Sequence, residues 1–142
     1  MNKDKLITQL SRDEGRVAYA YKDSLGYLTI GVGHLIDKAK GGSLPDSIID
    51  ALLSYDIDTH ANELFSKLPW VKDLDEARQG VLINMAFNLG VDGLLAFKNT
   101  LALIKAGKYS EASLEMLDSA WAKQVGDRSK RLSNQMRDGK WY

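Results

Sequence analysis

The sequence predicts an α+β fold in which a small β-hairpin lobe and a larger helical lobe are joined by one long helix. Two patterns predict this class. Residues 17–30 contain two short runs of β-forming side chains on either side of a turn, whereas the chain from residue 46 onward repeats its apolar residues at helical spacing. With 142 residues, 44% of them hydrophobic and 27% charged, the chain has the size and composition of one ordinary folded domain.

The first element is a helix, predicted over residues 3–13. Leu6, Ile7 and Leu10 recur at helical spacing, and Gly15 is a natural stop because glycine readily adopts the backbone conformation that ends a helix. We expect this N-terminal helix to belong to the larger helical lobe.

The hairpin lobe is predicted over about residues 13–45. Residues 17–21 and 27–30 are rich in β-branched and aromatic side chains and therefore favour strands. Residues 22–26 between them have the small and polar side chains of a turn. A loop rich in glycine is predicted over residues 37–45, where the lobe ends.

A connecting helix is predicted over about residues 46–68. A helix of about 22 residues is ~33 Å long, which is enough to join two lobes. Its pattern is amphipathic, with polar residues on the face opposite an apolar stripe. The stripe consists of Ile49, Leu52, Leu53, Ile57, Ala61, Leu64, Phe65 and Leu68.

The helical lobe is predicted over about residues 69–142. The segment Asp73–Glu76 suits a capping box, because an acidic cap is followed three positions later by glutamate. The apolar run 81–87 indicates the buried centre of a bundle, and Gly90 ends that helix. Later helices are expected to be capped by Asn99 or Thr100 and by Ser110, and the last to run from Gly126 to near Gly139.

The composition excludes several classes of protein. The chain has no cysteine, so it is not a disulfide-stapled scaffold, a zinc ribbon or an enzyme with a cysteine nucleophile. Lys plus Arg and Asp plus Glu are 19 each, and a net charge of zero argues against nucleic acid as a partner. Residues 1–97 hold 10 basic and 14 acidic side chains, a net charge of −4, and residues 98–142 hold 9 basic and 5 acidic side chains, a net charge of +4. The basic C-terminal segment suits an anionic polymer, or is simply a solvated helix face.

No targeting segment is expected at the start of the chain. The first residues turn polar again at Thr8-Gln9, so they lack the apolar run of a signal peptide. No stretch approaches the ~20 apolar residues that a membrane span needs. We therefore expect the chain to fold in a cytoplasm and to make no stable association with a membrane.

Glu14, Asp23 and Thr29 form the most suggestive group of polar residues. Glu14 lies at the end of the first helix, Asp23 in the hairpin turn and Thr29 on the returning strand, so a folded hairpin brings them to one edge. Glycoside hydrolysis needs one carboxyl group that is protonated and one that is ionised, and apolar packing favours the first state while a solvated turn favours the second. By spacing alone, the common structural roles of a helix-end glutamate and a turn aspartate explain the two acidic residues better than catalysis does.

The local sequence strengthens the catalytic interpretation. The hairpin region, the segment around residues 77–90 and the segment around residues 121–131 together resemble phage lysozymes of the T-even type, which belong to glycoside hydrolase family 24. The motifs that carry the resemblance are Asp13-Glu14-Gly15, Tyr21-Lys22-Asp23, Gly26-Tyr27-Leu28-Thr29-Ile30-Gly31-Val32-Gly33-His34-Leu35, Ala77-Arg78-Gln79, Ile83-Asn84-Met85-Ala86-Phe87-Asn88-Leu89-Gly90, Trp121-Ala122-Lys123-Gln124 and Asp127-Arg128-Ser129-Lys130-Arg131.

The resemblance implies a lysozyme-like fold and an endolysin that hydrolyses the β-1,4 bond between N-acetylmuramic acid and N-acetylglucosamine in bacterial peptidoglycan. It implies that Glu14 is the general acid, and that Asp23 and Thr29 hold the attacking water on the opposite face of the sugar, with inversion of configuration. It also implies a structural pair between His34 and Asp56, and substrate contacts by Gly33, Leu35, Phe87, Asn88, Thr100 and Arg128.

Other readings of the sequence stay open. A lytic transglycosylase would need the glutamate without a water-positioning Asp–Thr pair, and a non-catalytic peptidoglycan-binding module would keep the fold alone. His34 and His60 have no third ligand in view, so no metal site is predicted, and no cofactor is implied. The resemblance further implies a monomer that accumulates in the host cytoplasm, is released by a holin-type membrane lesion and acts in the periplasm.

Overall fold

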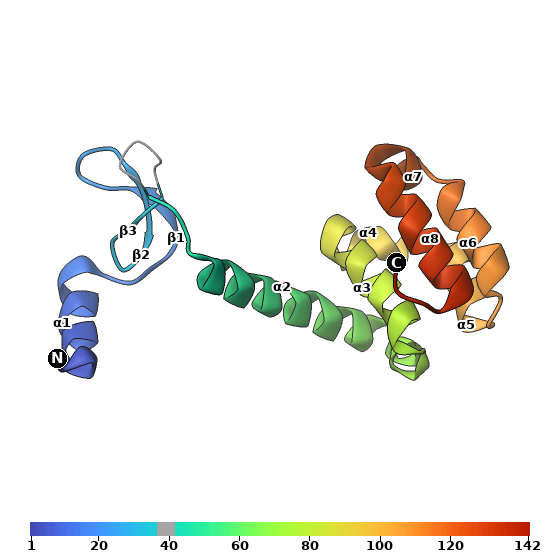
Figure 1. The fold of residues 1–142 in the computed structure, drawn as a ribbon, viewed down its shortest axis with the longest axis horizontal. Helices are drawn as coiled ribbons and strands as arrows, with labels where there is room; N and C mark the ends of the chain where they lie inside the picture. Colours follow the sequence, from blue (N-terminus) through green and yellow to red (C-terminus); the bar gives the residue numbers. More distant parts are fainter. Residues whose placement is uncertain (37–41) are drawn as a thin grey trace. The chain divides into compact units, whose positions relative to one another are not determined.

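A computed structural model of the chain describes residues 1–36 and 42–142 as mostly helical with one three-stranded antiparallel sheet, which confirms the α+β class (Figure 1). The chain divides into two compact units, residues 1–51 and residues 52–142. We call them the hairpin unit and the helical unit and describe each by itself. None of the described helices is long and apolar enough to cross a membrane.

The hairpin unit begins with helix α1, Lys3–Glu14, close to the predicted range. The Asn2 side chain caps it by accepting a hydrogen bond of 3.0 Å from the backbone N–H of Lys5. Gly15 ends it with φ of +77°, as predicted. None of the α1 side chains is buried. That the helix packs with the helical lobe stays a prediction.

The sheet of the hairpin unit has the order β1-β2-β3, formed by Val17–Lys22, Leu28–Gly31 and His34–Leu35. The first two strands and their turn were predicted. The third was not, because two residues give no period. Thr29 on the central strand pairs with Tyr21 on one side and Leu35 on the other. It is only 2% exposed. Of the predicted loop 37–45, residues 37–41 lie outside the described part of the chain.

Helix α2, Asp46–Lys67, occurs where the connecting helix was predicted and passes from one unit into the other. Only part of its apolar stripe is buried. Ala61 and Leu64 are buried with the core of the helical unit, whereas Leu52 and Leu53 in the preceding turns are about half exposed. The stripe therefore predicted the helix correctly and its burial only at the C-terminal end.

The helical unit is built around helix α3, Glu76–Leu89. Val81, Leu82, Met85 and Ala86 of this helix are all buried, which confirms the predicted centre of the bundle. Around it lie the other elements of the unit, and their side chains complete one apolar core. The elements are the 3₁₀ helix η2 (Pro69–Asp73), α3 (Glu76–Leu89), α4 (Val91–Leu95), α5 (Lys98–Lys105), α6 (Tyr109–Leu117), α7 (Ala120–Val125) and α8 (Asp127–Asp138).

Several predicted helix caps are wrong by a few residues. Asp75 rather than Asp73 caps α3, accepting from the Arg78 backbone N–H at 3.1 Å, because Asp73 belongs to η2. Asn99 and Thr100 lie inside α5, which starts after Phe97. Ser110 lies inside α6, which starts after Lys108. These two helices begin without a side-chain cap. The last helix and its end at Gly139 are as predicted.

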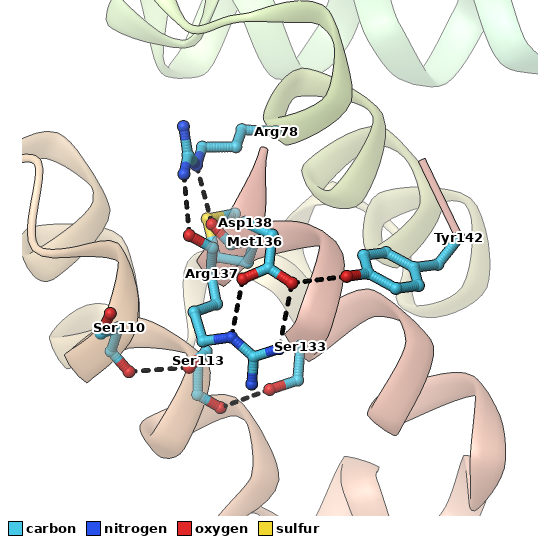
Figure 2. Close-up of polar contacts among 8 residues, drawn as sticks. All are labelled: Arg78, Ser110, Ser113, Ser133, Met136, Arg137, Asp138 and Tyr142. Carbon is cyan, nitrogen blue, oxygen red and sulfur yellow. Dashed lines mark hydrogen bonds and ion pairs between the residues drawn. The ribbon is translucent and has the colours of Figure 1, made fainter. Parts of the chain in front are cut away.

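Arg78 on α3 contacts two other helices of this unit, and Figure 2 shows its hydrogen bonds to the end of α8. Its guanidinium donates to the carbonyl oxygens of Met136 at 2.7 Å and Arg137 at 2.9 Å, and it lies 3.7 Å from the centre of the Tyr109 ring. The last carbonyls of a helix have no partner within the helix, so a cation placed there satisfies them and favours the helix dipole. Arg78 thus fixes the C-terminal end of α8 to the central helix.

Candidate functional site

In the hairpin unit, the Glu14 carboxyl group lies directly over Gly33. A Cβ atom on Gly33 would be only 3.2 Å from Oε2 and 3.3 Å from Cδ of Glu14. Gly33 also has φ of +68°, which side chains rarely adopt. Two residues that the sequence predicts for one site therefore meet, and glycine is what allows this approach. The Glu14 side chain is exposed within the described structure rather than packed among apolar groups.

Asp23 is fixed by the hairpin turn. Its Oδ1 accepts hydrogen bonds from the backbone N–H groups of Leu25 and Tyr27, both at 2.9 Å. Its own N–H donates to the Tyr27 carbonyl at 2.9 Å, and its carbonyl accepts from Gly26 at 3.0 Å. Only Oδ1 is used in this turn, and Oδ2 has no hydrogen-bond partner among the described residues. A carboxylate with one oxygen held and one available is suited to orient a water molecule.

Thr29 is linked to Asp23 through the backbone of Tyr27. The Thr29 hydroxyl donates to the Tyr27 carbonyl oxygen at 3.0 Å, and that same residue's N–H donates to Asp23. The hydroxyl proton is therefore used, but the oxygen lone pairs can still accept a hydrogen bond from water. Burial of Thr29 leaves little of its surface open. Tyr27 was not predicted as a site residue, because its contribution comes from main-chain atoms.

His34 and Leu35 lie on the edge strand β3. The His34 Nε2 atom is 2.7 Å from the carbonyl oxygen of Ser43, so this nitrogen is the donor. Leu35 is half-buried and faces Thr29 across the sheet. Asp56 belongs to the helical unit, where its carbonyl oxygen lies 2.7 Å from Nδ1 of His60. The structural pair between His34 and Asp56 stays a prediction.

The helical unit has an apolar cavity of about 410 Å³ that contains two of the predicted substrate-binding residues, Phe87 and Arg128. Phe87 is 36% exposed, and its ring centre is 5.2 Å from that of His60. Apolar cavities with a few polar groups on the wall are typical of sites that bind small molecules or sugars. The cavity is lined by Leu53, Ile57, Gly80, Ile83, Asn84, Phe87, Arg128 and Trp141.

Asn84 holds the Arg128 side chain at the wall of this cavity. Its Oδ1 accepts from Arg128 at 3.0 and 2.6 Å, and its backbone carbonyl accepts a third bond at 3.3 Å. No carboxylate pairs with Arg128 in the described part of the chain. The guanidinium is therefore oriented by neutral groups and keeps its charge available for an anion.

The remaining two predicted contacts differ from each other. Asn88 is exposed on α3, and its Oδ1 accepts a hydrogen bond of 2.9 Å from the indole N–H of Trp121. Thr100 on α5 is only 4% exposed, so little of it is open to a ligand. Its substrate contact stays a prediction that its burial does not favour.

Three neighbours of these residues were not predicted as site residues. Asn84 stands in the quoted apolar motif, but nothing in the motif indicates that it orients Arg128. Trp121 is buried, and its indole N–H holds Asn88. Trp141 is 67% exposed and forms a cavity wall beside Gly80, where a Cβ would be 2.4 Å from its ring. A tryptophan that can pack against a glycine is the sequence signal that could have indicated the contact between Trp141 and Gly80.

The small three-stranded antiparallel sheet, the long helix α2 and the helices that follow it are consistent with the lysozyme-like class of α+β proteins. A family model described as phage lysozyme matches residues 11–138. Probable T4-type lysozyme 1 of Dictyostelium discoideum is 35% identical, with 92% of each chain covered. Pre-baseplate central spike protein Gp5 of Enterobacteria phage T4 is 30% identical over 90% of this chain and 27% of its own length. The endolysin of Salmonella phage P22 is 32% identical over 59% of this chain and 60% of its own.

The chain belongs to the phage lysozyme family, since the family model covers most of its length. Membership of a lysozyme family makes it a glycosidase.

Proposed function

We propose that the chain is an endolysin of glycoside hydrolase family 24, which hydrolyses the β-1,4 bond between N-acetylmuramic acid and N-acetylglucosamine in bacterial peptidoglycan. The observation that carries this proposal is the group formed in the hairpin unit. Glu14 lies over Gly33, and the backbone of Tyr27 links Asp23 to Thr29. The family and its relatives support hydrolysis of this polymer.

In the proposed reaction, Glu14 donates its proton to the glycosidic oxygen as the bond from that oxygen to the anomeric carbon breaks. The Asp23 carboxylate stabilises the positive charge that develops on the sugar and accepts a proton from the attacking water. Thr29 helps to hold that water, whose oxygen forms the new bond to the anomeric carbon from the opposite face. The configuration therefore inverts, as in two-carboxylate enzymes that place a water between base and substrate.

The decisive experiment compares clearing of outer-membrane-permeabilised bacteria by wild type, Glu14→Gln and Asp13→Asn. Asp13 is the neighbouring carboxylate and pairs with Arg12 at 2.9 Å, so its variant is a matched control. Removing a general acid should lower the rate roughly 100- to 10,000-fold, whereas the control should clear like wild type. Equal clearing by Glu14→Gln and wild type would contradict the assignment. No clearing by wild type would favour a non-catalytic binding module.

Asp23→Asn tests the second carboxylate without removing the turn. An asparagine oxygen can still accept from the N–H groups of Leu25 and Tyr27, so the variant should fold. The variant should nevertheless lose most of the wild-type activity, because the amide is neutral and cannot take a proton from water. Near-full activity would mean that Asp23 only shapes the turn.

The alternative chemistry is that of a lytic transglycosylase, in which the substrate's own hydroxyl attacks and an anhydro-sugar forms. Asp23 with a free carboxylate oxygen favours a water nucleophile instead. Mass analysis of digested cell wall distinguishes the two, since hydrolysis leaves a reducing-end muramic acid that is heavier by one water. An anhydro product from the wild-type protein would replace the hydrolase proposal.

The proposal extends to where the protein acts and in what state. We propose a monomer that accumulates in the host cytoplasm, reaches the periplasm through a holin-type membrane lesion and causes host cell lysis. Expression without and with such a lesion checks this, since lysis should need both. Lysis without the lesion would indicate another export route.

A further inference from the structure

Trp121 and Asn88 form a hydrogen bond whose direction is fixed by chemistry. The indole nitrogen of Trp121 can only donate, so the Asn88 atom at 2.9 Å must be its oxygen. An asparagine amide otherwise has two orientations that exchange oxygen for nitrogen. This bond therefore commits the oxygen to the protein and turns the amide nitrogen away from Trp121.

The donor in this bond is held in place by its surroundings. Trp121 is 3% exposed, and its ring meets Phe97 edge-on at 6.1 Å between ring centres. The helix that carries it, α7, is capped by Ser119, whose side chain accepts from the Ala122 backbone N–H at 3.1 Å. A buried indole N–H that lost its acceptor would be costly, so Trp121 and Asn88 keep each other in one arrangement.

The consequence lies at the exposed end of Asn88. Its amide nitrogen carries two N–H donors, which have no hydrogen-bond partner among the described residues. Asn88 follows Phe87, whose ring lines the apolar cavity of the helical unit. A ligand group that matches two outward N–H donors is an acceptor without a proton of its own, and a carbonyl or carboxylate oxygen has this chemistry.

We propose that Trp121 is a positioning residue, which turns the Asn88 amide so that its nitrogen donates to a carbonyl or carboxylate oxygen of the glycan substrate. This inference rests on the proposed function, because it names the group by which the same substrate is held. Peptidoglycan offers that oxygen from two sources, the acetamido groups of the sugars and the stem peptides. The role of Trp121 is thus in substrate affinity rather than in bond cleavage.

The first test is Trp121→Phe, which keeps an aromatic ring and removes only the N–H donor and part of the ring. Steady-state kinetics on soluble peptidoglycan strands should show KM raised roughly 3- to 10-fold, the size expected for one hydrogen bond, with kcat within about twofold of wild type. Trp70→Phe is the matched control, because Trp70 is half-buried against the same core, whereas the Asn88 oxygen accepts from Trp121. A wild-type KM for Trp121→Phe, or a loss in kcat alone, would overturn the proposal.

The second test, Asn88→Asp, does not depend on whether the tryptophan variant folds. One carboxylate oxygen still accepts from Trp121, while the outward atom becomes an acceptor that faces another acceptor. The ratio of its KM to that of wild type should be roughly 10 or more at pH 7, and should fall as the pH approaches 4, since a protonated carboxyl regains a donor. A ratio that does not change with pH contradicts the proposed donor role.

The third experiment identifies which substrate oxygen accepts from the Asn88 amide nitrogen. Wild type and Asn88→Asp are compared on strands stripped of stem peptides and on strands whose sugars are de-N-acetylated. The difference between the two proteins should vanish on whichever substrate lacks the contacted group, and a difference that persists on both overturns the proposal. A wild-type protein that is inactive on intact peptidoglycan strands would overturn the proposed function instead, so the two failures are distinguishable.

Discussion

The two units of the chain differ in what stabilises them. Among the described residues of the hairpin unit, Thr29 alone is buried, and the turn is held by hydrogen bonds that Asp23 and Tyr27 make over four residues or fewer. The helical unit contains every buried apolar side chain in the described parts of the chain, arranged around α3. The candidate catalytic residues thus lie in the unit with little buried area, at the end of α1, in the hairpin turn and on β2. The candidate binding residues of the helical unit, from Phe87 to Arg128, lie on helices that rest on an apolar core.

This difference separates activity from stability. A side chain in the hairpin unit contributes little buried area, so its replacement should affect the reaction more than the free energy of unfolding. A core side chain of the helical unit should do the reverse, because its loss leaves a cavity. Variants matched between the units test this separation.

The largest effect on stability is expected from Leu82→Ala in the centre of α3, where the side chain is fully buried. The free energy of unfolding, measured by urea denaturation, should fall by about 2–5 kcal/mol. Leu25→Ala in the hairpin turn is the matched control, since this leucine is 75% exposed. Its effect should stay within about 0.5 kcal/mol. Equal losses for the two leucines would show that the units do not differ in this way.

Arg78→Met should have the next largest effect. The variant keeps much of the aliphatic stem but removes the donors to the Met136 and Arg137 carbonyls at the end of α8. Hydrogen bonds from charged groups are the stronger kind, and we expect a loss of about 1.5–3 kcal/mol in the free energy of unfolding. Arg12→Met removes an arginine whose side chain is 73% exposed and, among the residues that the structure describes, paired only with Asp13. It should change stability little. Comparable losses would mean that the helix-end contacts of Arg78 contribute nothing specific.

Much of the fold follows from patterns that the sequence contains, and the departures have physical causes. Periodicity and stop glycines predicted α1, α2, α3 and α8, because these signals are local. The contacts of Arg78 with α8 join residues 58 and 59 positions apart, and the partner atoms are main-chain carbonyls that exist at every residue. No pattern of side chains could have selected them.

The same limit applies to the candidate site. The family motifs predicted which residue types gather in the hairpin, and the approach of Glu14 to Gly33 agrees with them. The main-chain links through Tyr27 and the bond from Trp121 to Asn88 depend on geometry that the motifs do not specify. Thr100, predicted to contact substrate, lies inside α5 and is buried.

Gly33→Ala and Gly31→Ala form the sharpest pair within the hairpin unit. Both glycines have positive φ, +68° and +71°, so each alanine should cost about 1–2 kcal/mol of backbone strain. Only the Gly33 methyl group would meet Glu14, because a Cβ on Gly31 would have no atom of the described residues within 4 Å other than those of its chain neighbours. Lytic activity should therefore fall about 10-fold or more in Gly33→Ala alone, since small displacements of a reacting group are costly. Equal activities would mean that the Glu14 carboxyl does not need its place over Gly33.

The smallest effect is expected at the C-terminal end of the helical unit (Figure 2). The Asp138 carboxylate accepts from Arg137 at 2.8 and 3.0 Å and from the Tyr142 hydroxyl at 2.5 Å. The bond from Arg137, followed by that from Tyr142, holds the pKa of Asp138 well below its usual range. The bond to Asp138 in turn raises the pKa of Tyr142. These groups lie at the surface, so Asp138→Asn should lower Tm only slightly.

The pH dependence gives this small change a clear sign. A lowered pKa in the folded state contributes stability that is present above the unfolded pKa of about 4 and is lost as the pH falls through the folded pKa. The Tm difference between wild type and Asp138→Asn should therefore be largest near neutral pH and vanish in strong acid. The raised pKa of Tyr142 works in the opposite direction, so its share is lost as the pH rises above about 10. A Tm difference that persists into strong acid would show that the charge of the Asp138 carboxylate is not its cause. The contribution of Asp138 to stability would then come from packing, as it does for the core of the helical unit.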